Sequence, residues 1–216
     1  EYELLAEVCR RIISIDPAHQ ALLPLAATLD KLGQKTEALE VYRKILKIWP
    51  SHLRAGYEVA IYHFESGITA GDTAVASITA LKKAVASPDE FSPQEIIGAR
   101  IRMAALMIGR GDIDEGMQQL ADMPDKSVPD GDHAILGSAL AAASKSFLSA
   151  GKTDRAVKCL KKALRFLPDR TIKSDLSVLL ADEARKLLNA GEHDAAYEMA
   201  LQASGVAESF ETQKVA

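Results

Sequence analysis

The segment Ser146–Thr153 ends in Gly151-Lys152-Thr153, the three residues with which a phosphate-binding loop closes. Such a loop cradles phosphates with backbone amides, and it needs an earlier glycine and a preceding β-strand. Serine stands at the position of the earlier glycine, and the residues before it follow a helical pattern. We therefore interpret this segment as a turn between two helices, not as a nucleotide site.

Residues that could bind a metal or carry acid–base chemistry also lack the spacing they would need. No two histidines show the His-x-x-x-His spacing, and Cys9 and Cys159 form no Cys-x-x-Cys pair. Asp112, Asp114 and Glu115 begin a helical run, where carboxylates favour the helix dipole. No Gly-x-Ser-x-Gly nucleophile motif occurs. We expect no catalytic residue, no metal, no cofactor and no enzyme activity.

One helical run carries a stripe of basic residues, formed by Lys158, Lys161, Lys162 and Arg165. A nucleic-acid site would need aromatic residues among them or a wider basic field. The chain has a net charge of −4 and a pI near 5.8, which argues against nucleic acid and anionic membranes as partners. Two interpretations stay open: a solvated helix face, or a contact for an acidic partner protein.

The composition favours closely packed helices. Hydrophobic residues make up 48% of the 216 residues and aromatic residues only 5%, whereas sheets favour aromatic and β-branched side chains. Cys9 and Cys159 lie among apolar neighbours, which indicates buried thiols in a reducing compartment. No apolar run is long enough to span a membrane. We expect a cytoplasmic protein, although the sequence opens at Glu1, so a targeting segment can lie outside it.

Glycine recurs every forty residues, at Gly111, Gly151 and Gly191, each time between two helical runs. A fixed period of this size is typical of stacked repeats, in which neighbouring units complete each other's core. Such proteins hold partners on an extended surface, so the period favours binding over catalysis.

Prolines end the helical runs, because proline lacks an amide donor and clashes with the preceding turn. Ser92-Pro93-Gln94-Glu95 has the order of a capping box that starts a helix. We predict an all-α protein with one continuous domain over residues 1–204 and a tail or incomplete capping helix over 205–216. Eleven helices are predicted, at 2–15, 18–32, 35–48, 51–67, 73–86, 93–110, 112–123, 132–150, 152–167, 171–190 and 192–204.

Two segments, residues 19–50 and 137–168, carry a shared pattern of small residues, a turn glycine and a closing proline. The pattern consists of Leu22, Leu25, Ala26, Leu29, Gly33, Ala38, Tyr42, Ile45 and Pro50 in the first, and of Leu140, Ala143, Ser144, Phe147, Gly151, Ala156, Leu160, Ala163 and Pro168 in the second. The chain resembles the tetratricopeptide repeat (TPR) family, as a divergent array of bacterial type. The resemblance implies a right-handed α-solenoid of antiparallel helix pairs with about five and a half repeats.

The chain departs from the family in two ways. The family period is roughly 34 residues, whereas later steps here approach 40, with additions around 68–73, 88–93, 125–133 and 170–175. Residues 98–129 have Gly116 where alanine is usual, and Pro124 ends the second helix early. We expect this repeat to be the least stable.

In the TPR family, ligands lie on the concave face, which the first helix of each pair lines. The matching positions predict a partner-binding groove of nine residues: Tyr57, Ile61, Phe64, Ile101, Ala105, Ile108, Lys145, Leu148 and Arg185. Apolar residues that gather on a surface mark interaction sites. The alternative is that longer helices or a second copy of the chain cover these residues, which would then be core.

The resemblance implies a non-catalytic scaffold that binds another protein. A carboxylate-clamping groove of this family uses asparagines, and Asn189 is the only one here, so we expect an apolar or amphipathic partner segment. Nucleic acid is not expected as a partner, whereas a second copy of the chain stays open. The alternative function is the TPR region of a longer enzyme, such as a glycosyltransferase.

Overall fold

The computed structural model describes residues 1–18 and 20–208. The part of the predicted tail at 209–216 lies outside these residues. The described chain divides into two compact units, residues 1–106 and residues 107 onward. Each unit is described by itself, and the single continuous domain over 1–204 remains a prediction.

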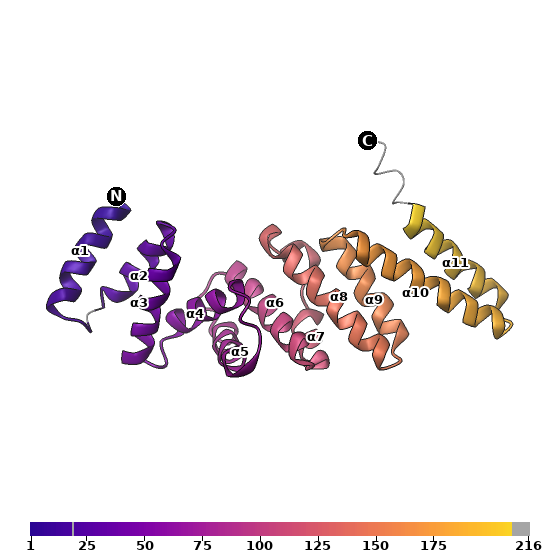
Figure 1. Ribbon diagram of the computed structural model, residues 1–216, viewed down its shortest axis with the longest axis horizontal. Coiled ribbons are helices and arrows are strands. Elements are labelled where there is room, and N and C mark those ends of the chain that lie inside the picture. The colour runs from indigo at the N-terminus through magenta and orange to yellow at the C-terminus, as the bar shows by residue number, and fades with distance from the viewer. Residues whose placement is uncertain (19, 209–216) are drawn as a thin grey trace. The chain divides into compact units, whose positions relative to one another are not determined.

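Unit 1 consists of helices joined by short turns (Figure 1). It contains α1 (Tyr2–Ile15), α2 (Leu22–Lys31), α3 (Lys35–Ile48), α4 (Leu53–Glu65), α5 (Gly71–Val85) and most of α6 (Pro93–Arg110). Consecutive helices from α1 to α5 pack against each other, and α2–α3 and α4–α5 form helix pairs. The unit is therefore built from neighbour contacts, as a repeat protein requires.

Unit 2 continues in the same way. It contains the end of α6, then α7 (Ile113–Ala121), the short 3-10 turns η1 (Asp125–Ser127) and η2 (Asp130–Asp132), α8 (His133–Ser149), α9 (Thr153–Phe166), α10 (Arg170–Asn189) and α11 (His193–Glu208). Helices α8 to α11 pack consecutively. The predicted all-α class and the eleven α-helices are confirmed, since residues 1–18 and 20–208 contain no strand.

Most predicted helix bounds agree with the structure within two residues, with three differences. Helix α2 begins at Leu22 because turns at residues 17–18 and 20–21 precede it, and the Ala18 amide donates to the Asp16 side chain at 3.1 Å. Helix α11 extends to Glu208, four residues beyond the predicted end. The predicted addition at 125–133 contains the two 3-10 turns, which the sequence pattern missed.

Glycine forms the turn inside each helix pair, as predicted. Gly33 follows α2 with φ of 74°, a left-handed conformation that strains any residue with a Cβ atom. The same conformation recurs at Gly67, Gly71, Gly111, Gly151 and Gly191. The forty-residue glycine period is therefore the period of the helix–turn–helix unit.

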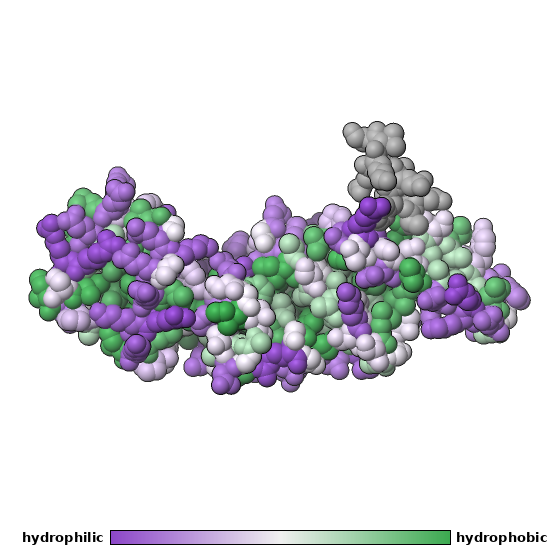
Figure 2. Space-filling view, viewed as in Figure 1, coloured by the Kyte–Doolittle hydropathy of each residue, from purple (hydrophilic) through white to green (hydrophobic). Residues whose placement is uncertain are grey.

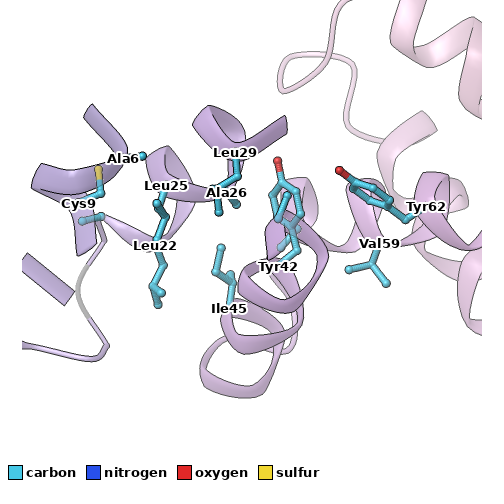
Figure 3. Packing of buried hydrophobic residues seen from close by; sticks show 13 residues of the cluster. Ala6, Cys9, Leu22, Leu25, Ala26, Leu29, Tyr42, Ile45, Val59 and Tyr62 are labelled. Carbon is cyan, nitrogen blue, oxygen red and sulfur yellow. The ribbon is translucent and has the colours of Figure 1, made fainter. Parts of the chain in front are cut away.

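Small residues form the centre of the packing in unit 1. Ala26, Ala38 and Ala55, from three different helices, have no exposed surface. Larger side chains such as Leu22 and Ile45 fill the space between the helices (Figure 3). On the face that Figure 2 shows, hydrophilic residues cover much of α1–α3 and hydrophobic residues lie between them. The core therefore follows the amphipathic stripe of each helix.

In unit 2, α8 approaches the end of α9 closely at Gly137. A Cβ atom at this position would overlap the Cβ atom of Leu167 and lie 3.3 Å from the Leu167 amide nitrogen. The backbone of Leu167 cannot move aside as a flexible side chain could. Glycine at 137 therefore sets the distance between α8 and the end of α9.

The predicted weak repeat has the shortest α-helix in the described residues, since α7 spans nine residues and ends three residues before Pro124. Two 3-10 turns follow it, and they contribute few helical hydrogen bonds. Few residues of α7 are fully buried; Leu120 is one of them.

We predict that Gly137→Ala lowers the free energy of unfolding by about 1–3 kcal/mol, because the added methyl group overpacks a backbone contact. Gly56→Ala in α4 is the matched control, since its Cβ atom would make an ordinary contact of 3.7 Å with Ala80 of α5. That variant should gain about 0.5–1 kcal/mol from helix propensity. Urea denaturation measures both changes, and equal effects would contradict the close approach.

Hydrogen exchange provides a second test. Amides of α7 and of residues 122–132 should exchange faster than those of α8 and α9, because a short helix and 3-10 turns open at low free-energy cost. Mass spectrometry of peptic peptides from the native protein measures the rates. Uniform protection across residues 113–166 would refute the weak repeat.

Candidate partner-binding surface

The nine residues of the predicted groove divide between the two units. Unit 1 holds Tyr57, Ile61, Phe64, Ile101 and Ala105, while unit 2 holds Ile108, Lys145, Leu148 and Arg185. In unit 1 they come from α4 and α6, and in unit 2 from α6, α8 and α10.

Three of the nine side chains are core, which corrects the expectation that they face a partner. Ile101 has no exposed surface, Ile108 is 4% exposed, and Tyr57 is 8% exposed. A buried side chain leaves no surface for another protein to contact. The alternative considered from sequence, that these positions are core, therefore holds for these three.

Tyr57 serves as an aromatic anchor inside unit 1. Its ring lies 5.0 Å from the ring of Phe91, which precedes α6, and the Arg54 guanidinium lies 4.5 Å from the Phe91 ring centroid. Aromatic pairs and cation–π contacts of this geometry stabilise packing beyond the area they bury. Tyr57 thus helps to fix α4 to the start of α6.

The half-buried members in unit 1 are Ile61, Phe64 and Ala105. Ile61 and Phe64 lie on α4, and the guanidinium of Arg102 from α6 lies 5.9 Å from the Phe64 ring centroid. An apolar edge beside a cation is a surface that an amphipathic segment can contact. We call Ile61, Phe64 and Ala105 the unit 1 groove residues.

A group of hydrogen bonds around Asp30 lies on α2, α3 and α4. The Tyr42 hydroxyl donates to Oδ2 of Asp30 at 3.0 Å, and the Tyr62 hydroxyl donates to Oδ1. Figure 3 shows the two hydroxyls at the same edge of the core. Burial raises the pKa of the Tyr42 hydroxyl, which therefore stays protonated as a donor. Sequence patterns missed this group because its members lie 12 and 32 residues apart.

A second polar group centres on Arg54, which donates to Glu58 at 3.4 Å and to Glu95 of α6. Glu95 also accepts from the Ser92 amide at 2.8 Å, while the Glu95 amide donates to the Ser92 hydroxyl at 3.3 Å. These reciprocal bonds confirm the predicted capping box. The cap of α6 is thereby joined to α4 through one arginine.

Burial and charge act differently on the two glutamates. Desolvation raises the pKa of Glu58 to about 7, despite the opposing effect of Arg54, and Asp30 and Glu95 add to the rise. At Glu95 burial also acts to raise the pKa, but hydrogen bonds from Arg54 and Ser92 outweigh it, so the pKa is lowered. The pKa of Glu58 is therefore close to neutral pH, whereas Glu95 is ionised at neutral pH.

In unit 2, Lys145, Leu148 and Arg185 are exposed, and Leu148 is 38% exposed. Arg185 pairs with Asp182 of its own helix at 3.1 Å. Surface ion pairs of this kind contribute little to stability. These three side chains are therefore accessible to a partner.

Gly151-Lys152-Thr153 lies between α8 and α9, with Gly151 in a left-handed conformation and Lys152 directly before the first residue of α9. The helix-pair interpretation of this segment is confirmed.

Both cysteines are free and buried. Among residues 1–18 and 20–208, no group of three His, Cys, Asp or Glu side chains could hold a metal ion. Over the same residues, no helix is long and apolar enough to cross a membrane.

Replacing Glu58 tests the pH dependence of unit 1. The folded pKa near 7 lies above the ordinary value of 4.5, so the folded state binds the proton more tightly than the unfolded state. Stability should therefore fall as pH rises from about 4.5 to 7, by up to about 3 kcal/mol, and level off above that. In Glu58→Gln this fall should be lost when unfolding is measured by denaturant at pH 5, 6, 7 and 8.

Glu95→Gln is the control for this measurement, because the pKa of Glu95 is lowered and its titration lies below pH 4.5. This variant should lose stability at every pH yet keep most of the fall between pH 5 and 7, because burial is the largest cause of the raised pKa of Glu58. A Glu58→Gln protein with an unchanged pH profile would show that Glu58 does not titrate in this range.

Comparisons with known proteins agree with the helix-pair architecture. Residues 20–52 match the sequence pattern described as tetratricopeptide repeat. No curated protein sequence matches the chain.

Several solved structures are similar to the chain. The crystal structure of MamA is 21% identical, covers 74% of this chain and 85% of its own, and has a TM-score of 0.48. Pseudomonas aeruginosa pilF is 18% identical, with coverages of 92% and 87% and a TM-score of 0.46. YrrB, described as a TPR protein with an unusual peptide-binding site, is 17% identical, with coverages of 77% and 96% and a TM-score of 0.37.

The matched segment 20–52 begins just before α2 and ends just before α4, so it coincides with the α2–α3 pair and its glycine turn. The later pairs repeat this design, with a glycine in the left-handed conformation at each turn. The resemblance to the tetratricopeptide repeat family is therefore confirmed, with residues 20–52 as the repeat that matches in sequence.

Proposed function

We propose that the chain is a non-catalytic scaffold that binds an apolar or amphipathic segment of another protein. A TPR-type fold points to protein–protein interaction in general. The observation that carries the finer proposal concerns the unit 1 groove residues. Half-buried Phe64 lies beside the Arg102 guanidinium, and half-buried Ile61 precedes it by three residues on the same helix. An amphipathic partner segment would cover the apolar surface of the unit 1 groove residues, and its polar side chains would contact the neighbouring charged groups.

Two polar groups of unit 1 favour a rigid binding face. Arg54 links α4 to α6 through Glu95, and Asp30 joins α2, α3 and α4 through two tyrosine hydroxyls. A surface that is already ordered loses less entropy when it binds. In unit 2 the exposed Lys145, Leu148 and Arg185 remain part of the proposal as further contacts.

The proposal places the chain in the cytoplasm. Cys9 and Cys159 are free and buried, and such thiols are usual in a reducing compartment. Burial raises the pKa of the Cys159 thiol, which keeps it protonated and unreactive.

Photo-crosslinking from position 61 tests the proposal. A benzophenone amino acid in place of Ile61 should capture a partner in cells, and the same residue in place of Val75, which is 44% exposed on α5, should not capture it. The affinity of the purified partner is then measured for the Phe64→Glu variant and for the matched control Val75→Glu.

Phe64→Glu should weaken partner binding at least tenfold, because a desolvated aromatic contact is worth more than about 1.4 kcal/mol. Its melting temperature should stay within a few degrees, since Phe64 is only half-buried. Val75→Glu should bind normally. Unchanged binding by Phe64→Glu would remove this surface from the proposal, whereas Ile101→Glu should unfold the protein because Ile101 is core.

A further inference from the structure

Unit 2 has a hollow between α7 and α9 that the proposed function does not use. Its volume is about 390 Å³, and we call it the α7–α9 hollow. It is lined by residues of α7 and α9, together with Phe147 of α8. This size lies within the range of ligand-binding pockets.

The floor of the hollow is apolar. Leu120, Phe147 and Cys159 are buried beneath it, while Met117 is half-buried and Ala121 is exposed. Methionine is flexible and adapts to different partners, and alanine leaves room for an incoming side chain. A large apolar side chain would therefore find packing partners on several sides.

The rim of the hollow is cationic. Arg155, Lys158 and Lys162 all lie on α9, and Asp114 is the acidic residue that lines it. Asp114 pairs with Arg155 at 2.7 Å, and Asp125 lies 3.8 Å from Lys162. The side chains on the rim thus have a net positive charge, although the whole chain has a net charge of −4.

The chain already shows how a carboxylate binds here. Asp125 forms ion pairs with Arg165 at 2.9 Å and with Lys162, and Asp114 forms one with Arg155. Carboxylates of two other segments therefore already bind the basic face of α9. Lys158 is exposed between these pairs and lines the hollow itself. Charge complementarity therefore favours an acidic group beside an apolar one.

We propose that the α7–α9 hollow is a second docking site, which binds an acidic amphipathic segment of another protein. An apolar side chain of that segment enters the hollow, and its carboxylates pair with Lys158 and Lys162. A helix that presents apolar anchors three or four residues apart, flanked by glutamates, has this chemistry. The site lies in unit 2, so it stands or fails independently of the groove residues in unit 1.

The test uses the full chain and a panel of helical peptides of about 18 residues, or five turns. Each peptide carries Leu, Ile, Phe or Met at two anchor positions and Glu on the flanks. At least one should bind with a Kd below about 100 µM in fluorescence anisotropy, and its affinity should fall as salt rises. Peptides with Lys for Glu, or with Ser at the anchors, should bind at least tenfold more weakly.

Charge reversal locates the site. Lys158→Glu should lower the affinity for the peptide at least tenfold, because it places a carboxylate on the rim that repels the glutamates of the peptide. Lys161→Glu is the matched control, with the same change in net charge on the same helix, since Lys161 bonds to Gln202 at 2.8 Å and does not line the hollow. It should change the affinity by no more than about twofold.

Methyl-labelled methionine gives a second readout, because the chain has five methionines and only Met117 lines the hollow. Peptide binding should shift the Met117 signal and leave Met103 and Met199 unchanged. Failure of the whole panel to bind, equal effects of the two charge reversals, or equal binding of the Ser-anchor peptide would each overturn the proposal. A Met117 shift that grows with protein concentration alone would instead assign the hollow to a second copy of the chain.

Discussion

The structure depends on the close approach of neighbouring helices, which small side chains at their contact permit. Ala26, Ala38 and Ala55 in unit 1 and Ala143, Ala156 and Ala163 in unit 2 have no exposed surface. Interaxial distances at the short end of the range leave room only for such residues at the crossing, while leucine and isoleucine fill the flanks. At Gly137 even a methyl group is too large. Because each helix buries its stripe against its neighbours in sequence, stability is local to each part of the chain.

This local packing explains why the candidate surfaces are polar as well as apolar. A helix that uses one stripe for the core presents its other side chains at the edge of that core. In unit 1 this edge holds Asp30, Glu58 and Glu95, with Arg54 among them. Glu58 shares Arg54 with Glu95 and also lies within the field of Asp30, so burial, its largest influence, raises its pKa despite Arg54.

Length differences between the helices have a related consequence in unit 2. Helix α7 has nine residues and the facing α9 has fourteen, and Ala121, the last residue of α7, lies at the hollow between them. The short helix that we predict to open early thus also lines a hollow with apolar side chains. The predicted early-opening segment and the candidate docking site therefore share one stretch of chain.

The helical repeat could be predicted from sequence because its signals are local. The glycine period, the closing prolines and the Ser92–Glu95 capping box each fix the backbone within a few residues, so the helix bounds agree closely with the structure. The resemblance to the TPR family also implied that positions on α4 and α6 meet a partner.

Only the tertiary structure decided which of those positions are exposed. Ile61 and Ile101 have the same side chain, and both were predicted to line the groove, yet Ile61 is half-buried and Ile101 has no exposed surface. The linkage of Asp30 to Tyr62 and of Arg54 to Glu95 likewise joins residues 32 and 41 positions apart. The sequence by itself determined where helices begin, turn and end, because hydrogen bonds and dihedral angles act over neighbouring residues. Burial and charge coupling depend on which helices meet in space, and the three-dimensional packing alone decides that.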